Sequence, residues 1–89
     1  MPTVLVPAPF QGPTAGQSEI EVDASTLRAA IQAVDAQFPG FSAQIFDAAG
    51  GLHSFVKLAC NGEVMERGDL DRAVGADDQL EVLSPVSGG

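Results

Sequence analysis

The chain ends in two glycines, Gly88 and Gly89, and this terminus has the most readable chemistry in the sequence. At an average glycine usage of ~7%, roughly 0.5% of chains would end in such a pair by chance. Glycine has no Cβ, so a Gly-Gly end can enter a channel too narrow for side chains. The terminal carboxylate can attack the α-phosphorus of ATP if an enzyme supplies Mg²⁺ and positioning. The product is an acyl-adenylate, which is activated toward sulfur or nitrogen nucleophiles.

The residues before the glycine pair favour a tail that extends away from a folded domain. Pro85 fixes φ near −65° and has no N–H to donate, which suits a residue that follows a strand. At ~3.3–3.6 Å per residue, residues 84–89 reach about 20 Å, far enough to place the carboxylate inside a partner's active site. We therefore predict a folded domain over residues 1–84 and a flexible, exposed Gly-Gly tail over residues 85–89. In this tail Gly89 is the reacting residue, and the residues that bind in the partner's channel are Pro85, Val86, Ser87 and Gly88.

Length and hydrophobicity predict one small globular domain. The chain has 89 residues, of which 45% are hydrophobic, so a packed core is expected rather than disorder. No stretch approaches the ~20 apolar residues that span a bilayer. Residues 1–10 contain three prolines and no positive charge, unlike a signal peptide. We therefore expect a cytoplasmic protein.

Charge and cysteine content exclude several classes of partner and cofactor. Four basic and twelve acidic residues give a formal net charge of −8, which repels nucleic-acid phosphates and anionic membranes. The single cysteine, Cys60, excludes an intramolecular disulfide and an all-cysteine iron–sulfur cluster. One histidine and scattered carboxylates form no metal-ligand pattern. We expect no nucleic acid, no membrane and no metal.

The first half of the chain predicts a hairpin and a helix. Residues 3–7 and 18–22 are rich in strand formers, and the Pro- and Gly-rich residues 8–17 predict a loop between them. Ser25 or Thr26 is a suitable N-cap for a helix. The helix would bury one apolar stripe and end at Pro39-Gly40, with a short helical turn over residues 41–48. The residues of this stripe are Leu27, Ala30, Ile31, Val34 and Phe38.

The second half predicts three more strands. Residues 55–60 are expected to form the central strand, and residues 63–65 its hairpin partner across a type I′ turn at Asn61-Gly62. The central strand should place one set of side chains on the buried face, namely Val56, Leu58 and Cys60. It should place the other set on the opposite face, namely Phe55, Lys57 and Ala59. Residues 66–78 are polar, with Leu70 and Val74 as apolar anchors, and residues 79–84 form the last strand.

The order of elements is strand, strand, helix and three strands. A mixed sheet of about five strands packed on one main helix, with the last strand beside the first, is an α+β fold of the β-grasp, or ubiquitin-like, type.

The sequence resembles the ThiS/MoaD family of ubiquitin-like sulfur carriers over nearly its whole length. The matching segments are Asp23-Ala24-Ser25-Thr26-Leu27, Phe38-Pro39-Gly40, Val56-Lys57-Leu58-Ala59-Cys60-Asn61-Gly62-Glu63 and residues 76–89. Within the family, Leu52-His53-Ser54-Phe55-Val56 and the loop over residues 8–17 are most similar to the actinobacterial type of carrier that serves cysteine synthesis. Two positions depart from the family pattern: Ser87 replaces a common alanine, and Ser84 replaces an apolar residue.

The resemblance implies that the protein is a co-substrate and not an enzyme. An E1-like adenylating or sulfurtransferase enzyme would use ATP and Mg²⁺ to convert Gly89 to its acyl-adenylate. A sulfur donor would then displace AMP and leave a terminal thiocarboxylate. The carrier itself would bind no cofactor.

Three destinations for the activated Gly89 remain open at this stage. In cysteine synthesis the thiocarboxylate would attack an aminoacrylate held on pyridoxal phosphate by a cysteine-synthase-like partner, and a metalloprotease would release the product. Alternatively, the chain is the small subunit of molybdopterin synthase, acting with the large subunit, or a thiamine sulfur carrier. In a different class, it is a protein modifier that joins Gly89 to lysines of its targets.

Other residues that could do chemistry have simpler structural interpretations. Cys60 is expected to be a buried thiol, His53 a structural or surface residue, and Lys57 a solvated residue of the sheet. The arginines are expected to pair with nearby carboxylates, which contributes only ~0–1 kcal/mol at a surface. These arginines are Arg28, Arg67 and Arg72.

Overall fold

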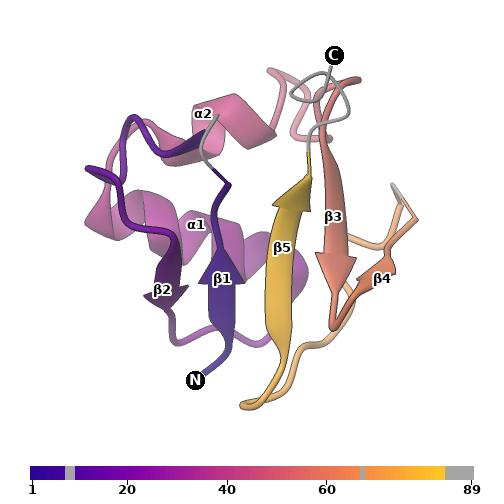
Figure 1. Ribbon diagram of the computed structural model, residues 1–89. Coiled ribbons are helices and arrows are strands. Elements are labelled where there is room, and N and C mark those ends of the chain that lie inside the picture. The colour runs from indigo at the N-terminus through magenta and orange to yellow at the C-terminus, as the bar shows by residue number, and fades with distance from the viewer. Residues whose placement is uncertain (8–9, 67, 84–89) are drawn as a thin grey trace.

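The computed structural model describes residues 1–7, 10–66 and 68–83 (Figure 1). Within them the chain forms five strands and two helices. These are β1 (Thr3–Leu5), β2 (Glu19–Glu21), α1 (Leu27–Gln37), α2 (Phe41–Ile45), β3 (Lys57–Cys60), β4 (Glu63–Val64) and β5 (Gln79–Leu83).

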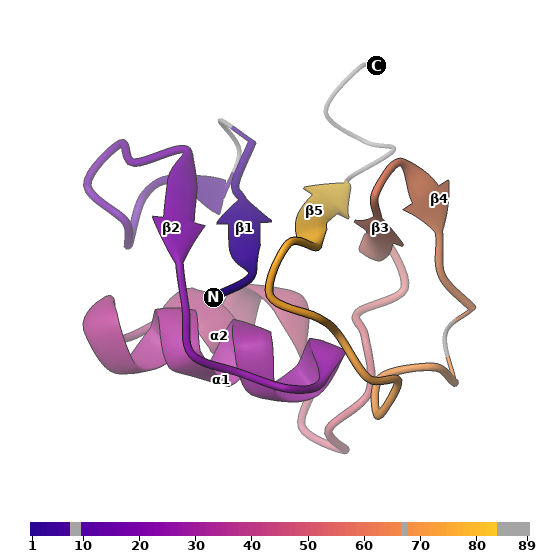
Figure 2. The same ribbon diagram turned by 90° about the horizontal axis from the view of Figure 1, so that it is seen from below.

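The strands form one mixed sheet in the order β2-β1-β5-β3-β4. Strands β1 and β5 are parallel, and the other neighbouring pairs are antiparallel. Both helices lie on one face of the sheet (Figure 2). The predicted α+β fold and the pairing of the last strand with the first are therefore confirmed.

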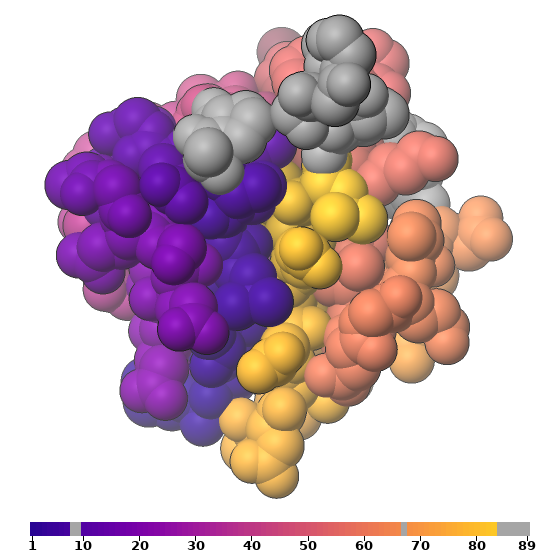
Figure 3. Space-filling view, in the orientation of Figure 1, coloured from indigo at the N-terminus to yellow at the C-terminus, as the bar shows by residue number. Residues whose placement is uncertain are grey.

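The prediction that residues 55–60 form the central strand is wrong, because β5 occupies the centre. The chain makes two hairpins, β1–β2 and β3–β4, at opposite edges of the sheet. Strand β5 fills the space between them and pairs with β1 on one side and β3 on the other. In the space-filling view β5 lies exposed between these two neighbours (Figure 3).

Strand β3 is also shorter than predicted. The backbone N–H of Val56 donates to the carbonyl of His53 at 3.0 Å, so the segment before Lys57 forms a turn. The ladder with β5 begins only at Lys57, which is the partner of Leu83. Val56 still joins the core, as its predicted face required.

Helix α1 begins and ends where its sequence predicts. Of the two candidate caps, Thr26 is the N-cap, and its hydroxyl oxygen accepts from the N–H of Ala29 at 3.1 Å. Gly40 has a φ of +103°, a left-handed conformation that favours glycine, and α2 follows directly. The carboxylate of Asp35 accepts from the N–H of Gly40 at 3.1 Å and of Ser42 at 3.0 Å, so it joins the two helices.

The core lies between the sheet and the helices. Helix α1 buries Leu27, Ala30, Ile31 and Val34, whereas Phe38 is only partly buried. The loop after β1 adds Phe10, which sequence reasoning did not place in the core. At ~25 cal/mol per Å² of buried apolar area, such a core is the main stabilising term of the fold.

Neither α1 nor α2 has both the length and the apolar character of a helix that crosses a bilayer, and no other helix occurs among the described residues.

Candidate functional site

The residues predicted to form the functional tail lie outside the described part of the chain. They are Pro85, Val86, Ser87, Gly88 and Gly89, and the division between residues 1–84 and 85–89 stays a prediction. The structure does describe β5, whose last residue, Leu83, comes six residues before the carboxyl terminus.

Strand β5 is anchored both in the core and, through its two neighbours, in the sheet. Leu80 and Val82 are buried among the residues of the core. Ladder hydrogen bonds to β1 and β3 join the strand to both hairpins. The segment that ends at the carboxyl terminus therefore follows the central strand of the sheet.

The first residue of β5 is held by the turn between β3 and β4. Asn61 donates its side-chain amide to Asp78 at 3.0 Å and accepts from the backbone N–H of Gln79 at 2.9 Å. The backbone N–H of Asn61 donates to the carbonyl of Gln79 at 2.8 Å. We call this group of hydrogen bonds the Asn61–Asp78 clamp. It fixes the register between β5 and the β3–β4 hairpin.

Asp78 completes the clamp through its second carboxylate oxygen. That oxygen accepts from the backbone N–H of Gly75 at 2.8 Å. The hydrogen bond from Gly75, followed by the one from Asn61, lowers the pKa of Asp78 below its ordinary value. Sequence reasoning identified the Asn61-Gly62 turn but missed Asp78, although an aspartate just before a strand is a common turn residue.

The sheet face opposite the helices is mixed in character. Register places ten residues on it: Thr3, Leu5, Glu19, Glu21, Lys57, Ala59, Val64, Gln79, Glu81 and Leu83. Three of these are acidic and one, Lys57, is basic. Lys57 is exposed, as predicted, and it is the only lysine of the chain.

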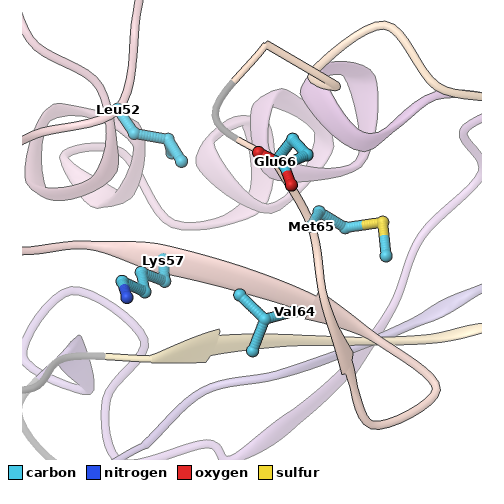
Figure 4. A pocket seen from close by; sticks show the side chains of 5 residues that line it. All are labelled: Leu52, Lys57, Val64, Met65 and Glu66. Carbon is cyan, nitrogen blue, oxygen red and sulfur yellow. The ribbon is translucent and has the colours of Figure 1, made fainter.

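A half-open groove lies between the start of β3 and the segment that follows β4 (Figure 4). Its volume is about 410 Å³, and we call it the β3–β4 groove. Its lining is mostly apolar, with one cation and one carboxylate. The lining residues are Leu52, Lys57, Val64, Met65 and Glu66.

Cys60 is buried, with 8% of its surface exposed, as expected for a structural thiol. Burial, with a further contribution from the charge of Asp78, raises the pKa of this thiol. Because the thiolate is the reactive form, Cys60 is poorly suited to carry sulfur as a persulfide.

His53 lies in the segment before β3 and has a structural environment. Its Nε2 atom is 3.1 Å from the carbonyl oxygen of Ala43 at α2, and its ring stacks on Phe55 at a centroid distance of 5.4 Å. This agrees with the expected structural role.

Arg28 binds more groups than the predicted carboxylate. Its guanidinium lies 3.5 Å from Asp71, donates to the carbonyl of Gly50 at 2.6 Å, and sits 5.4 Å from the ring centroid of Phe46. These contacts hold the loop before β3 against α1. Arg72 instead donates to the sulfur of Met65 at 3.1 Å, and Arg67 lies outside the described residues.

Among residues 1–7, 10–66 and 68–83, no three histidine, cysteine or acidic side chains come together as a metal site.

Comparison with known proteins decides the family. The family model of the ThiS family matches residues 4–89, which is almost the entire chain, including its Gly-Gly end. The chain belongs to the ThiS family.

Individual relatives agree with this assignment. Sulfur carrier protein CysO of Mycobacterium tuberculosis is 33% identical over 90 residues, which cover 98% of this chain and 97% of that protein. The crystal structure of a BexX/CysO complex from Amycolatopsis orientalis contains a chain that matches with a TM-score of 0.90 at 28% identity, covering all of both chains. SAMP1 from Haloferax volcanii matches with a TM-score of 0.77 at 26% identity, covering 99% of this chain and 98% of SAMP1.

As a member of the ThiS family, the protein is a ubiquitin-like sulfur carrier and not a catalyst. The reacting group of ThiS-family carriers is the carboxyl terminus, which here follows the central strand.

Proposed function

We propose that this protein carries sulfur for cysteine synthesis as a thiocarboxylate on Gly89. The observation that supports the destination is the similarity to CysO over 98% of the chain. The base of the tail is consistent with this role, because β5 presents the following six residues from the middle of the sheet.

The reaction proceeds in two balanced steps. The Gly89 carboxylate displaces pyrophosphate from ATP and forms an acyl-adenylate on an E1-like adenylating or sulfurtransferase enzyme. A sulfide equivalent from a sulfur donor then displaces AMP, so that one carboxyl oxygen is replaced by sulfur. ATP and Mg²⁺ belong to the activating enzyme, whose bound metal neutralises the charge of the phosphates.

The thiocarboxylate is suited to the next step because sulfur is softer and more nucleophilic than oxygen. We propose that an acceptor enzyme of the cysteine-synthase type, which uses pyridoxal phosphate, receives this sulfur. Once this sulfur is bonded to the acceptor's substrate, Gly89 is joined to it as a thioester. An acyl shift from sulfur to nitrogen then breaks the C–S acyl bond and leaves the new cysteine amide-linked to Gly89. A metalloprotease would hydrolyse that amide and restore the carboxylate. The CysO of Amycolatopsis orientalis forms a complex with a protein named BexX, which supports a carrier that acts by assembling with a partner protein.

Tail residues Pro85, Val86, Ser87 and Gly88 are proposed to bind in the partner's channel. Two consecutive glycines without Cβ atoms allow the backbone to approach the enzyme closely.

We place the whole reaction in the cytoplasm, where ATP and pyridoxal phosphate are available. Cell fractionation tests this placement.

A reconstitution tests the destination. The thiocarboxylated carrier is incubated with the pyridoxal-phosphate synthase and its amino-acid substrate, and intact mass is measured. We expect a carrier heavier by one amide-linked cysteine, and the metalloprotease should return it to the unmodified mass.

Other destinations give different products in the same experiment. Sulfur loss only with a molybdopterin synthase large subunit and its pterin precursor, or only with thiamine enzymes, would overturn the cysteine assignment. Reductant-resistant conjugates to lysines of other proteins would instead indicate a protein modifier.

A further inference from the structure

We propose that the β3–β4 groove binds this chain's own C-terminal segment, residues 84–89, with the terminal carboxylate beside the ammonium of Lys57. This is an intramolecular contact and does not depend on the sulfur chemistry, because it needs only the free carboxylate.

The groove lies within reach of the segment. Lys57 and Leu83 are Cα partners in the β3–β5 ladder, so the chain leaves β5 directly beside a residue that lines the groove. Figure 1 shows the end of β5 and the start of β3 at the same end of the sheet. Neighbouring strands lie ~4.8 Å apart, so the far side of β3 is about 10 Å from Leu83. Six residues extend to about 20 Å, which is enough to cross the start of β3 and enter the groove.

The chemistry of the groove matches that of the segment. Val64, which is 53% exposed, supplies most of the accessible apolar surface of the groove, and the buried residues Leu52 and Met65 lie beside it in the lining. The segment contributes Pro85 and Val86 as apolar side chains. A volume of about 410 Å³ lies within the ~300–1,000 Å³ typical of ligand pockets and holds a few residues.

The charges of the groove favour an anionic end at its Lys57 side, because Lys57 is the one cation of the lining and the carboxylate of Glu66 lies apart from it (Figure 4). Lys57 is the only lysine in a chain of net charge −8, and within residues 1–7, 10–66 and 68–83 the one recorded ion pair is that of Arg28 with Asp71. The ammonium of Lys57 thus lies beside the origin of a segment that ends in an anion. A thiocarboxylate is also an anion, so the loaded and unloaded carriers should both bind.

The consequence is competition between the groove and the enzyme that binds the tail. While the segment occupies the groove, its terminus cannot enter the active site of the enzyme. A partner must then bind the undocked form, and its apparent affinity falls in proportion to the undocked fraction.

The primary test compares ¹H–¹⁵N spectra of the full chain and of a chain ending at Leu83. We expect shift differences at the amides of Leu52, Val64, Met65 and Glu66, and no differences at the opposite edge of the sheet, in β2. These differences should be independent of protein concentration and should shrink as salt shortens the Debye length from ~30 Å to ~3 Å.

A charge-matched pair of variants separates the ion pair from a general charge effect. Lys57→Gln removes the ammonium, and Lys57→Gln/Gln79→Lys restores net charge at the other end of β5, about 13 Å from Leu83 along the strand. Both variants should lower the ratio of docked to undocked chains by about 1.5- to 5-fold, as expected for an exposed ion pair. In the full-length variants, the heteronuclear NOE values of the Val86 and Gly88 amides should fall below those of wild type as the docked fraction falls.

Three outcomes would overturn the proposal. Identical groove amides in the full and truncated chains would mean that the segment does not bind there. Concentration-dependent shifts would assign the groove to a second copy of the chain. Groove shifts that appear only on addition of the activating enzyme would assign it to that enzyme.

Discussion

Two residues in the turns beside β5, Asn61 and Asp78, fix the start of the strand that leads to the functional terminus. Asn61 and Gly62 have φ values of +53° and +86°, as the predicted type I′ turn requires. This turn could be predicted because the Asn-Gly pair is itself the signal. The contribution of Asp78 could not, because Asp77 and Asp78 are equivalent in the sequence, and only the tertiary register selects the one that meets Asn61.

Replacing Gly62 with alanine should destabilise the protein by about 1–2 kcal/mol, the cost of a left-handed residue with a Cβ. The space around Gly62 is open, since no atom lies within 4 Å of the added Cβ, so the cost comes only from the backbone. Gly68 also faces open space but has no left-handed φ. Urea unfolding should show that Gly68→Ala changes stability by less than about 0.5 kcal/mol. Equal effects of the two substitutions would contradict the turn assignment.

Asp78 should give the protein an acid-sensitive component of stability. Its folded-state pKa is lowered, so its stabilising effect is present above the ordinary value of 3.8 and is lost as pH falls through the lowered value. Wild type should therefore be more stable than Asp78→Asn near neutral pH, and the difference should narrow below about pH 4. Urea unfolding at several pH values measures this difference. Asp77→Asn is the matched control, and a pH-independent gap for Asp78→Asn would refute the mechanism.

At the scale of elements, helix α1 buries the face that its periodicity predicts. Residues at helical spacing share one stripe, so the stripe was readable from the sequence alone. The burial of Ala59 was not readable, since strand alternation places it on the outer face. Its ladder partners Glu81 and Val64 flank it on both sides, and larger neighbours cover a small side chain.

The Ile31→Ala substitution in α1 should lower the free energy of unfolding by about 2–5 kcal/mol, because it leaves a cavity in a fully buried site. The next residue, Gln32, is exposed, and Gln32→Ala should be neutral or slightly stabilising. Chemical denaturation of both variants provides the comparison. A loss below about 1 kcal/mol for Ile31→Ala would mean that α1 does not pack as described.

At the scale of the whole molecule, the sequence predicts the β-grasp fold because its hairpins, helix and last strand come in a characteristic order. The central position of β5 was not predicted, because strand order depends on how two separate hairpins share a partner. The predicted site lies outside the described residues, so its assignment depends on sequence and on family membership. What the structure adds is the base of that site, namely β5, the Asn61–Asp78 clamp and the adjacent groove.

Blocking the terminus should abolish activation without affecting the fold. Gly89→Ala adds a Cβ atom that a channel too narrow for side chains would exclude. One residue added after Gly89 moves the terminal carboxylate away from the reacting position. Neither change touches a described core residue, so thermal unfolding should match wild type while adenylate formation is lost. If both variants instead melted at a clearly lower temperature than wild type, the terminus would belong to the folded domain.

The most direct test of the account is the intact mass of the carrier after incubation with the E1-like enzyme, ATP, Mg²⁺ and a sulfide source. Replacement of one oxygen by one sulfur, located in the C-terminal peptide at Gly89, is the predicted result. Addition of a whole sulfur atom at Cys60, or adenylation of Gly89 with no exchange of oxygen for sulfur, would contradict it.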